Sequence, residues 1–241
     1  MRMIDLVDDF TSQLNEALKI AENSVFTVKA NVQNVLISGL GGSGIGASIA
    51  KQIADLQTNI PIEASKSYFI PGYVNQNTLV IISSYSGNTE ETLNALKLAL
   101  EKNAHIICIT SGGEIEKIAN TNKLDLIKLP AGFPPRACLG YSLTQLLQVF
   151  YKYGIIKENP LKEISSVAEF LKNERENIKT EAQHIAKKIH DKTPVIYTTT
   201  YNEALAIRVR QQLNENSKML CWHHVIPEMN HNELVGWRDK N

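Results

Sequence analysis

The most informative residues of this chain form a hydroxyl-rich stretch at positions 83–92, directly after the apolar run 79–82. Leucines at helical spacing follow over residues 93–100, so the segment predicts a strand, a tight loop and the start of a helix. Free backbone N–H groups and the positive end of the helix dipole favour an anion at such a helix start. Three side chains of the loop could donate hydrogen bonds to that anion: Ser84, Ser86 and Thr89.

The serine-rich loop contains no lysine, unlike the phosphate-binding loop of nucleoside triphosphatases, which ends in Gly-Lys-Ser/Thr. We therefore expect it to bind a single phosphate monoester rather than a metal-bound triphosphate. A phosphosugar is the natural candidate. The alternative interpretation of the same residues is a serine-rich turn and helix N-cap that bind no ligand.

A glycine-rich turn occupies residues 39–46, between the strand pattern at 35–38 and apolar residues at helical spacing. Glycines let backbone N–H groups approach a ligand closely and adopt positive φ where other residues would clash. We expect Gly42 and Ser43 to contact the same phosphate as the serine-rich loop.

The glycine-rich turn also fits the dinucleotide-binding pattern G-x-G-x-x-G. Gly39, Gly41 and Gly44 take the glycine positions, and the acidic Glu63 lies nineteen residues after the last of them. A dinucleotide site does not require a second hydroxyl-rich loop after a later strand. The two loops together favour a sugar phosphate, and a tight turn without a ligand is the remaining alternative.

Strand and helix patterns alternate up to about residue 154, after an amphipathic opening helix over residues 3–23. Such alternation predicts an α/β fold with a doubly wound, parallel, five-stranded sheet flanked by helices. Ligands of such sheets bind at the carboxyl ends of the strands, where both loops lie. The expected strands span 33–38, 60–64, 78–83, 105–110 and 125–129, and the expected helices span 44–56, 89–102, 113–120 and 139–153.

Residues 155–241 predict a second, smaller unit after a first domain at residues 1–154. Pro160 marks a linker over 155–162, and the polar pattern from Leu161 to His190 predicts one long helix or a broken pair. The remaining expected elements are a strand over 193–199, a helix over 204–213 with Asn202 as its N-cap, and a short strand from Met219 to Trp222. This unit is too short for a doubly wound domain like the first.

Charge balance and cysteine usage limit the class of protein. Lysine plus arginine equals aspartate plus glutamate at 25 each, so no basic excess indicates a nucleic-acid or membrane-surface partner. The first ten residues form no export signal and no stretch reaches the length of a membrane span, so we expect a cytoplasmic protein. Cys108, Cys138 and Cys221 are widely separated, which favours reduced, structural cysteines. The adjacent His223 and His224 have poor spacing for a shared metal, and we expect no metal.

Five motifs, in order along the chain, resemble one family. GGSG at 41–44 and SYSGNTEET at 84–92 resemble the sugar isomerase (SIS) domain. FPPR at 133–136, LNENSK at 213–218 and PEMNHNELVGW at 227–237 resemble the bifunctional phosphoglucose/phosphomannose isomerases of bacteria and archaea. The resemblance implies interconversion of glucose 6-phosphate or mannose 6-phosphate with fructose 6-phosphate through an enediol, without a cofactor.

By this resemblance Glu215 is the base that moves a proton between C2 and C1, His231 acts on the ring oxygen and the O1 hydroxyl, and Arg136 stabilises the enediolate. In the family the histidine enters the site from the neighbouring subunit, which implies a two-fold homodimer with shared active sites. The ordinary alternatives are a solvated acid at a helix end, a surface histidine and a surface salt bridge. Glu228 and Glu233 are rival acids that could instead orient the loop.

Members of the resembled family carry a complete second SIS domain, which would extend the chain beyond Asn241. We therefore expect a truncated chain. In the family, the absent part carries a lysine near the reacting sugar and a threonine associated with accepting the mannose epimer. A noncatalytic sugar-phosphate binder or regulator is the second function class. Retention of Glu215, Arg136 and His231 favours the enzyme, whereas the short second unit favours binding without turnover.

Overall fold

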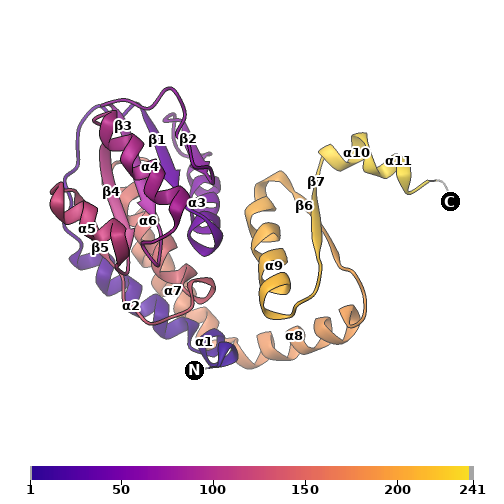
Figure 1. The fold of residues 1–241 in the computed structure, drawn as a ribbon. Coiled ribbons are helices and arrows are strands. Elements are labelled where there is room, and N and C mark those ends of the chain that lie inside the picture. Colours follow the sequence, from indigo (N-terminus) through magenta and orange to yellow (C-terminus); the bar gives the residue numbers. More distant parts are fainter. Residues whose placement is uncertain (1, 239–241) are drawn as a thin grey trace. The chain divides into compact units, whose positions relative to one another are not determined.

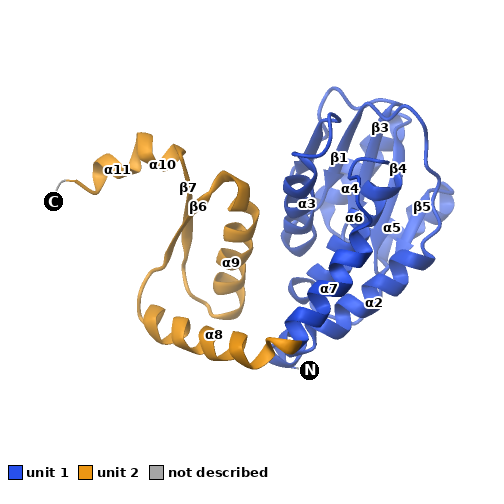
Figure 2. Cartoon of the chain, turned by 180° about the vertical axis from the view of Figure 1, so that it is seen from behind, with its two compact units in different colours: residues 1–172 blue, residues 173–241 orange. Residues whose placement is uncertain are grey.

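The computed structural model describes residues 2–238, and the chain divides into two compact units, residues 1–172 and 173–241 (Figure 2). The first unit contains a sheet of five parallel strands with helices on both faces (Figure 1). The second unit contains a sheet of two parallel strands with helices of its own.

The sheet of the first unit is built from five strands: β1 (Asn34–Ser38), β2 (Ile62–Ser65), β3 (Thr78–Ser83), β4 (His105–Thr110) and β5 (Asp125–Lys128). Their order is β2-β1-β3-β4-β5, which confirms the predicted parallel sheet and is a doubly wound arrangement. Strands β3 and β4 are buried along their whole length, as is typical of parallel strands covered on both faces. The winding reverses between β1 and β3, so the loops that follow these two strands lie at the switch point of the sheet.

The helices of the first unit are α1 (Met3–Asp8), α2 (Phe10–Asn23), α3 (Gly41–Ala54), α4 (Glu90–Glu101), α5 (Gly113–Thr121), α6 (Leu139–Lys152) and α7 (Pro160–Asn173). Alternate residues of each strand point to opposite faces and form two apolar cores. On one face, Ala50 of α3 and Phe150 of α6 pack with Ile37 of β1. On the other, Leu96 of α4 packs with Ile82 of β3. Helices therefore cover both faces of the sheet, and loops lie at the carboxyl ends of its strands, where ligands of such sheets bind.

The start of the chain differs from its prediction. In place of one helix over residues 3–23, the backbone leaves helical geometry at Asp9 (φ −93°, ψ 13°), which separates α1 from α2. Helix α3 begins at Gly41 rather than at residue 44, because the glycines themselves form its first turn.

In the second unit, β6 (Val195–Thr199) pairs in parallel with β7 (Trp222–Ile226), and α9 (Glu203–Asn216) connects them. Of the two alternatives predicted for the polar segment after residue 160, the structure has two helices rather than one long helix. These helices, α7 and α8 (Arg175–Ile189), are separated at Glu174. Two short helices, α10 (Glu228–His231) and α11 (Glu233–Gly236), complete this unit.

The last strand is wrong in the prediction, which placed it from Met219 to Trp222. Residues 217–219 instead close the end of α9: the Met219 amide donates to the Leu213 carbonyl oxygen (3.3 Å), and the Asn214 side chain donates to the Met219 carbonyl oxygen (2.8 Å). The strand therefore starts at Trp222, where it was expected to end.

A buried histidine ties the segment before β1 to the amino-terminal edge of the sheet. His105 Nε2 lies 3.0 Å from the Thr27 carbonyl oxygen, which also accepts a hydrogen bond from the Tyr153 hydroxyl (2.9 Å). The Asp125 carboxylate accepts from the Thr27 amide (3.0 Å) and lies 4.0 Å from His105 Nε2. Burial lowers the pKa of His105, and the nearby positive charge of Lys29 adds to that effect, while Asp125 opposes it.

We expect His105 to make the first unit less stable in mild acid. Because its pKa is lowered on folding, the unfolded chain takes up the proton first, so the free energy of unfolding falls as the pH drops through the ordinary histidine pKa near 6.5. Denaturant unfolding at pH 7.5 and pH 5.5 should show a smaller pH effect for His105→Gln than for the unmodified chain. His184→Gln, at an exposed position of α8, is the control and should leave the pH effect unchanged. An identical pH effect in His105→Gln would contradict the assignment.

Candidate active site

The glycine-rich loop leads from β1 into α3 and lies against a distant part of the chain. A Cβ atom at Gly42 would lie 2.7 Å from the Pro135 carbonyl oxygen and 3.8 Å from the Arg136 Cα atom. Only glycine permits so close an approach. The N-cap residue Leu40 makes no side-chain cap at the start of α3, and an uncapped helix start of this kind favours an anion.

The serine-rich loop leads from β3 into α4. Thr89 is the N-cap residue of α4, yet its hydroxyl does not cap the helix and instead lies 3.0 Å from the Ser84 hydroxyl. The Ser86 hydroxyl accepts a hydrogen bond from the Asn88 amide (3.3 Å). This loop therefore also presents an uncapped helix start beside grouped hydroxyls, as a phosphate site requires.

The two loops meet at the switch point of the sheet. The Ser43 hydroxyl, from the first turn of α3, accepts a hydrogen bond from the Tyr85 amide of the serine-rich loop (3.3 Å). A Cβ atom at Gly39 would lie 2.8 Å from the Ser83 carbonyl oxygen, so the two backbones are also in close contact. The structure thus brings together the predicted phosphate ligands of both loops: Gly42, Ser43, Ser84, Ser86 and Thr89.

Arg136 lies in a segment that we call the arginine turn, residues 130–137, which includes the short 3₁₀ helix Pro135–Ala137. The turn is held from α2 by Gln13, whose amide nitrogen donates to the Ala137 carbonyl oxygen (2.6 Å) and whose amide oxygen accepts from the Gly140 amide (2.9 Å). Together with the contact to Gly42, these bonds place the backbone of Arg136 beside the glycine-rich loop. The first unit therefore brings the predicted phosphate ligands and Arg136 together.

Lys66 is a cation near this site that the sequence did not reveal. It directly follows β2, and its Cε atom lies 3.5 Å from the position of a Cβ atom at Gly44. Neither loop contains a lysine, but the residue that follows the neighbouring strand places one beside the glycine-rich loop. Only the strand order, with β2 next to β1, places Lys66 there.

Glu215 lies in the second unit, near the end of α9. The Lys218 ammonium donates to the Glu215 carbonyl oxygen (2.6 Å) and closes the turn after the helix. Burial lowers the pKa of the Arg208 guanidinium, and the negative charge of Glu215 opposes that shift. The carboxylate is thus close to a cation of its own helix.

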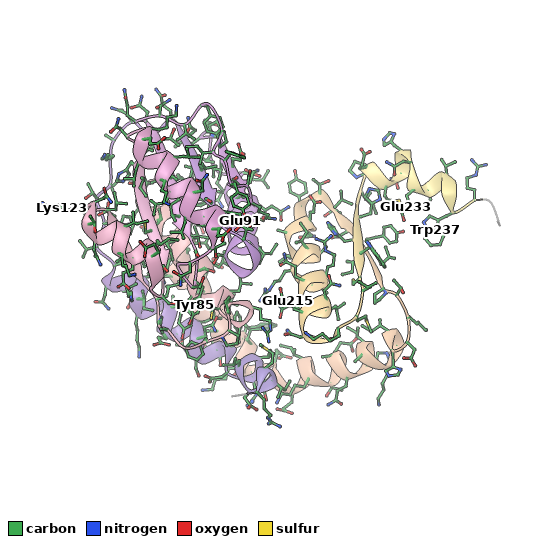
Figure 3. All side chains as sticks on the ribbon, viewed as in Figure 1. Tyr85, Glu91, Lys123, Glu215, Glu233 and Trp237 are labelled. Carbon is green, nitrogen blue, oxygen red and sulfur yellow. The ribbon has the colours of Figure 1, made fainter. Side chains whose placement is uncertain are left out.

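His231 is the last residue of α10, and Glu233, two residues later, lies close to Trp237 (Figure 3). The Glu233 carboxylate accepts hydrogen bonds from the Tyr197 hydroxyl and from the Trp237 indole (3.2 Å), and it lies 2.5 Å from His224 Nδ1. The Tyr197 and His224 contacts lower the pKa of Glu233. A carboxylate engaged in this way orients α10 and α11, in line with the hypothesis that Glu233 orients the loop.

The predicted residues are therefore divided between the units. The predicted phosphate ligands and Arg136 lie in the first unit, and Glu215 and His231 lie in the second. Glu63, the acidic residue of the dinucleotide pattern, accepts a hydrogen bond from the Tyr73 hydroxyl (2.9 Å). Within residues 2–238, no three His, Cys, Asp or Glu side chains are grouped closely enough to hold a metal ion, and no helix has the length and apolarity to cross a membrane.

Comparison with known proteins identifies the family. The SIS domain matches residues 30–131, which contain both loops, and the bacterial phospho-glucose isomerase C-terminal SIS domain matches residues 178–241. The bifunctional phosphoglucose/phosphomannose isomerase of Caldicellulosiruptor bescii is 40% identical over 242 residues, covering 97% of this chain and 71% of that protein. The chain belongs to the bifunctional phosphoglucose/phosphomannose isomerase family.

A second bifunctional phosphoglucose/phosphomannose isomerase, from Aquifex aeolicus, is 35% identical over 206 residues, covering 85% of this chain and 62% of that protein. The chain thus spans 71% and 62% of the lengths of these two relatives. Among solved structures, the C-terminal domain of glucosamine-fructose-6-phosphate aminotransferase from Francisella tularensis superposes with a TM-score of 0.71 at 18% identity, covering 95% of this chain and 72% of that chain. The isomerase family predicted from the five motifs is confirmed, and so is its α/β fold with a parallel sheet.

Proposed function

We propose that this protein interconverts fructose 6-phosphate with glucose 6-phosphate and mannose 6-phosphate. One observation carries the proposal: the glycine-rich and serine-rich loops, each leading into a helix, meet at the switch point of the sheet, and the backbone of Arg136 lies beside them. The chain that contains them belongs to this isomerase family. Uncapped helix starts and neutral hydroxyls suit a phosphate monoester. Five residues form the phosphate site: Gly42, Ser43, Ser84, Ser86 and Thr89.

The chemistry follows from what an aldose–ketose isomerisation requires. Glu215 removes the C2 proton of the open-chain aldose, and the C1 carbonyl oxygen takes up the negative charge of the enediolate. Glu215 then returns the proton to C1 while a proton moves from the O2 hydroxyl to O1, which leaves the ketone at C2. Arg136, a permanent cation, stabilises the charge on the enediolate oxygens. His231 transfers a proton to the ring oxygen and from the O1 hydroxyl when the ring opens. No cofactor enters these steps.

The proposal also covers the roles of the two parts of the chain and its assembly. In this proposal residues 1–154 bind the phosphosugar, residues 155–241 form an incomplete second SIS-like domain, and His231 is supplied by the neighbouring subunit of a cytoplasmic homodimer. The alternative is a noncatalytic sugar-phosphate binder, which would use the same phosphate site without turnover.

Ser84→Ala tests the phosphate site. We expect the affinity for inorganic phosphate and for fructose 6-phosphate to fall about tenfold to a hundredfold, because a hydrogen bond to a charged group is worth about 1.5–3 kcal/mol. Isothermal titration with both ligands measures the change. Ser166→Ala, which removes an exposed hydroxyl from α7, is the matched control and should bind both ligands normally.

Turnover is tested by coupled detection of glucose 6-phosphate and mannose 6-phosphate formed from fructose 6-phosphate. Formation of both products by the protein, reduced in Ser84→Ala, is the expected result. Tight binding of phosphosugars with neither product formed would favour the noncatalytic binder. Binding of NAD in preference to phosphosugars would overturn the proposal and favour the dinucleotide interpretation of residues 39–46.

A further inference from the structure

Tyr85 stands in the middle of the serine-rich loop but points away from its hydroxyls. Its side chain is only 7% exposed, and its hydroxyl donates to the Pro130 carbonyl oxygen (2.8 Å) and accepts from the Phe133 amide (3.1 Å). Both partners belong to the arginine turn. One side chain of the serine-rich loop therefore holds the segment that carries Arg136.

The backbone of Tyr85 also makes hydrogen bonds to other segments. Its amide donates to the Ser43 hydroxyl (3.3 Å) of the glycine-rich loop. Its carbonyl oxygen accepts from the Ser111 amide (3.0 Å) and the Ser111 hydroxyl (2.6 Å), at the end of β4. This residue thus joins four segments: the glycine-rich loop, the serine-rich loop, the end of β4 and the arginine turn. A movement of either loop must therefore change the position of Tyr85.

The link from Tyr85 to Arg136 is short and stiff. Phe133, whose amide is held by the tyrosine hydroxyl, is followed by Pro134 and Pro135, and each proline ring restricts φ. On the other side of Arg136, Gln13 holds the Ala137 carbonyl oxygen (2.6 Å). Arg136 therefore lies between two anchoring contacts, one from Tyr85 of the serine-rich loop and one from Gln13 of α2.

The environment keeps the tyrosine hydroxyl in its protonated form. Burial raises the pKa of Tyr85 to about 12, so the group remains a donor to Pro130 at any pH at which the protein would work. A hydroxyl that both donates and accepts cannot be replaced by phenylalanine without leaving the Pro130 carbonyl and the Phe133 amide unpaired.

We propose that Tyr85 is a positioning residue that couples the phosphate site to Arg136, holding the guanidinium where the enediolate forms. The inference rests on the proposed function, because it takes the roles of the phosphate site and of Arg136 from it. Tyr85 is not one of the five proposed phosphate ligands, and its hydroxyl contacts the arginine turn, through which it acts. Its loss should therefore affect the enediolate state more than phosphate binding.

Two probes separate these effects: inorganic phosphate, and the phosphorylated hydroxamate of a five-carbon sugar acid, which mimics the enediolate. We expect Tyr85→Phe to bind inorganic phosphate normally but to bind the hydroxamate about tenfold to a hundredfold more weakly, since a displacement of about 1 Å at a reacting group has effects of this size. In the Arg136→Ala background, Tyr85→Phe should cause no further loss. Tyr153→Phe is the matched control, because its hydroxyl also donates to a carbonyl oxygen (2.9 Å), that of Thr27, and it should bind both probes normally.

Other outcomes overturn the inference in distinguishable ways. Equal weakening of both probes would mean that Tyr85 shapes only the phosphate site. A loss of hydroxamate affinity that persists in the Arg136→Ala background would mean that Tyr85 does not act through Arg136. An unmodified protein that binds neither probe would overturn the proposed function itself, and the role of Tyr85 with it.

A measurement on the unmodified protein covers the case in which Tyr85→Phe does not fold. Saturation with inorganic phosphate should slow hydrogen exchange of the Phe133 amide, which Tyr85 holds, and leave exchange of the Leu124 amide unchanged. The latter donates to the Ala119 carbonyl oxygen (2.9 Å) at the far end of α5. Exchange at Phe133 that does not respond to phosphate would overturn the coupling.

Discussion

Glu215→Gln is expected to lower the turnover of fructose 6-phosphate by about 10²–10⁴-fold, the contribution of a positioned general base. Glutamine keeps the size of the side chain but cannot accept the C1 proton of the ketose. The affinity for inorganic phosphate should not change, because Glu215 is not one of the proposed phosphate ligands. The coupled assay measures turnover, and titration with inorganic phosphate measures affinity on the same samples.

The rival acid Glu228 provides the control for this prediction. It lies in the same polar motif as His231, and its carboxylate accepts a hydrogen bond from the Asn232 side chain (3.0 Å). Glu228→Gln should therefore retain most of the turnover. If Glu228→Gln lost activity while Glu215→Gln kept it, the roles assigned to the two acids would have to be exchanged.

The local parts of this fold were predictable because the signals that specify them are local. Apolar runs followed by glycine or serine loops place β1 and β3 correctly, and the loops at 39–46 and 83–89 lead into helices as expected. The two wrong predictions, the single helix over 3–23 and the strand from Met219, have causes that involve only a few residues. The break at Asp9 is a single residue in an otherwise helical pattern, and the apolar residues 219–221 resemble a strand although Met219 belongs to the end of α9.

The contacts that assemble the site could not be read from the chain in the same way. The proximity of Gly42 to Pro135, and of Lys66 to Gly44, depends on the strand order and on the packing of α3 beside the arginine turn. The inward direction of Tyr85, within a loop of hydroxyls, likewise depends on tertiary packing. Sequence motifs predicted the residues of the proposed phosphate site, but only the folded structure shows what holds Arg136 beside them.

We expect Gly87→Ala to disrupt the serine-rich loop more than any other substitution that adds one methyl group. Gly87 has φ +69°, and a Cβ atom there would lie 1.8 Å from the Gly112 carbonyl oxygen and 2.8 Å from the Thr110 hydroxyl. The left-handed conformation alone costs an alanine about 1–2 kcal/mol, and the overlap with backbone atoms must add to this. The Gly87 carbonyl oxygen also accepts from the Ile115 amide (3.0 Å), so a displaced loop weakens its contact with α5.

Gly154→Ala separates the two costs, because Gly154 has nearly the same φ (+67°) but no atom within 4 Å of its Cβ position. We expect denaturant unfolding to show a loss of about 1–2 kcal/mol for Gly154→Ala and a clearly larger loss for Gly87→Ala. Titration should show that Gly87→Ala alone abolishes phosphate binding, since Ser84, Ser86 and Thr89 lose their arrangement when the loop moves. Equal losses of stability, with phosphate binding retained in both variants, would contradict this prediction. They would show that the Gly112 carbonyl oxygen is easily displaced and that the loop does not need glycine for its shape.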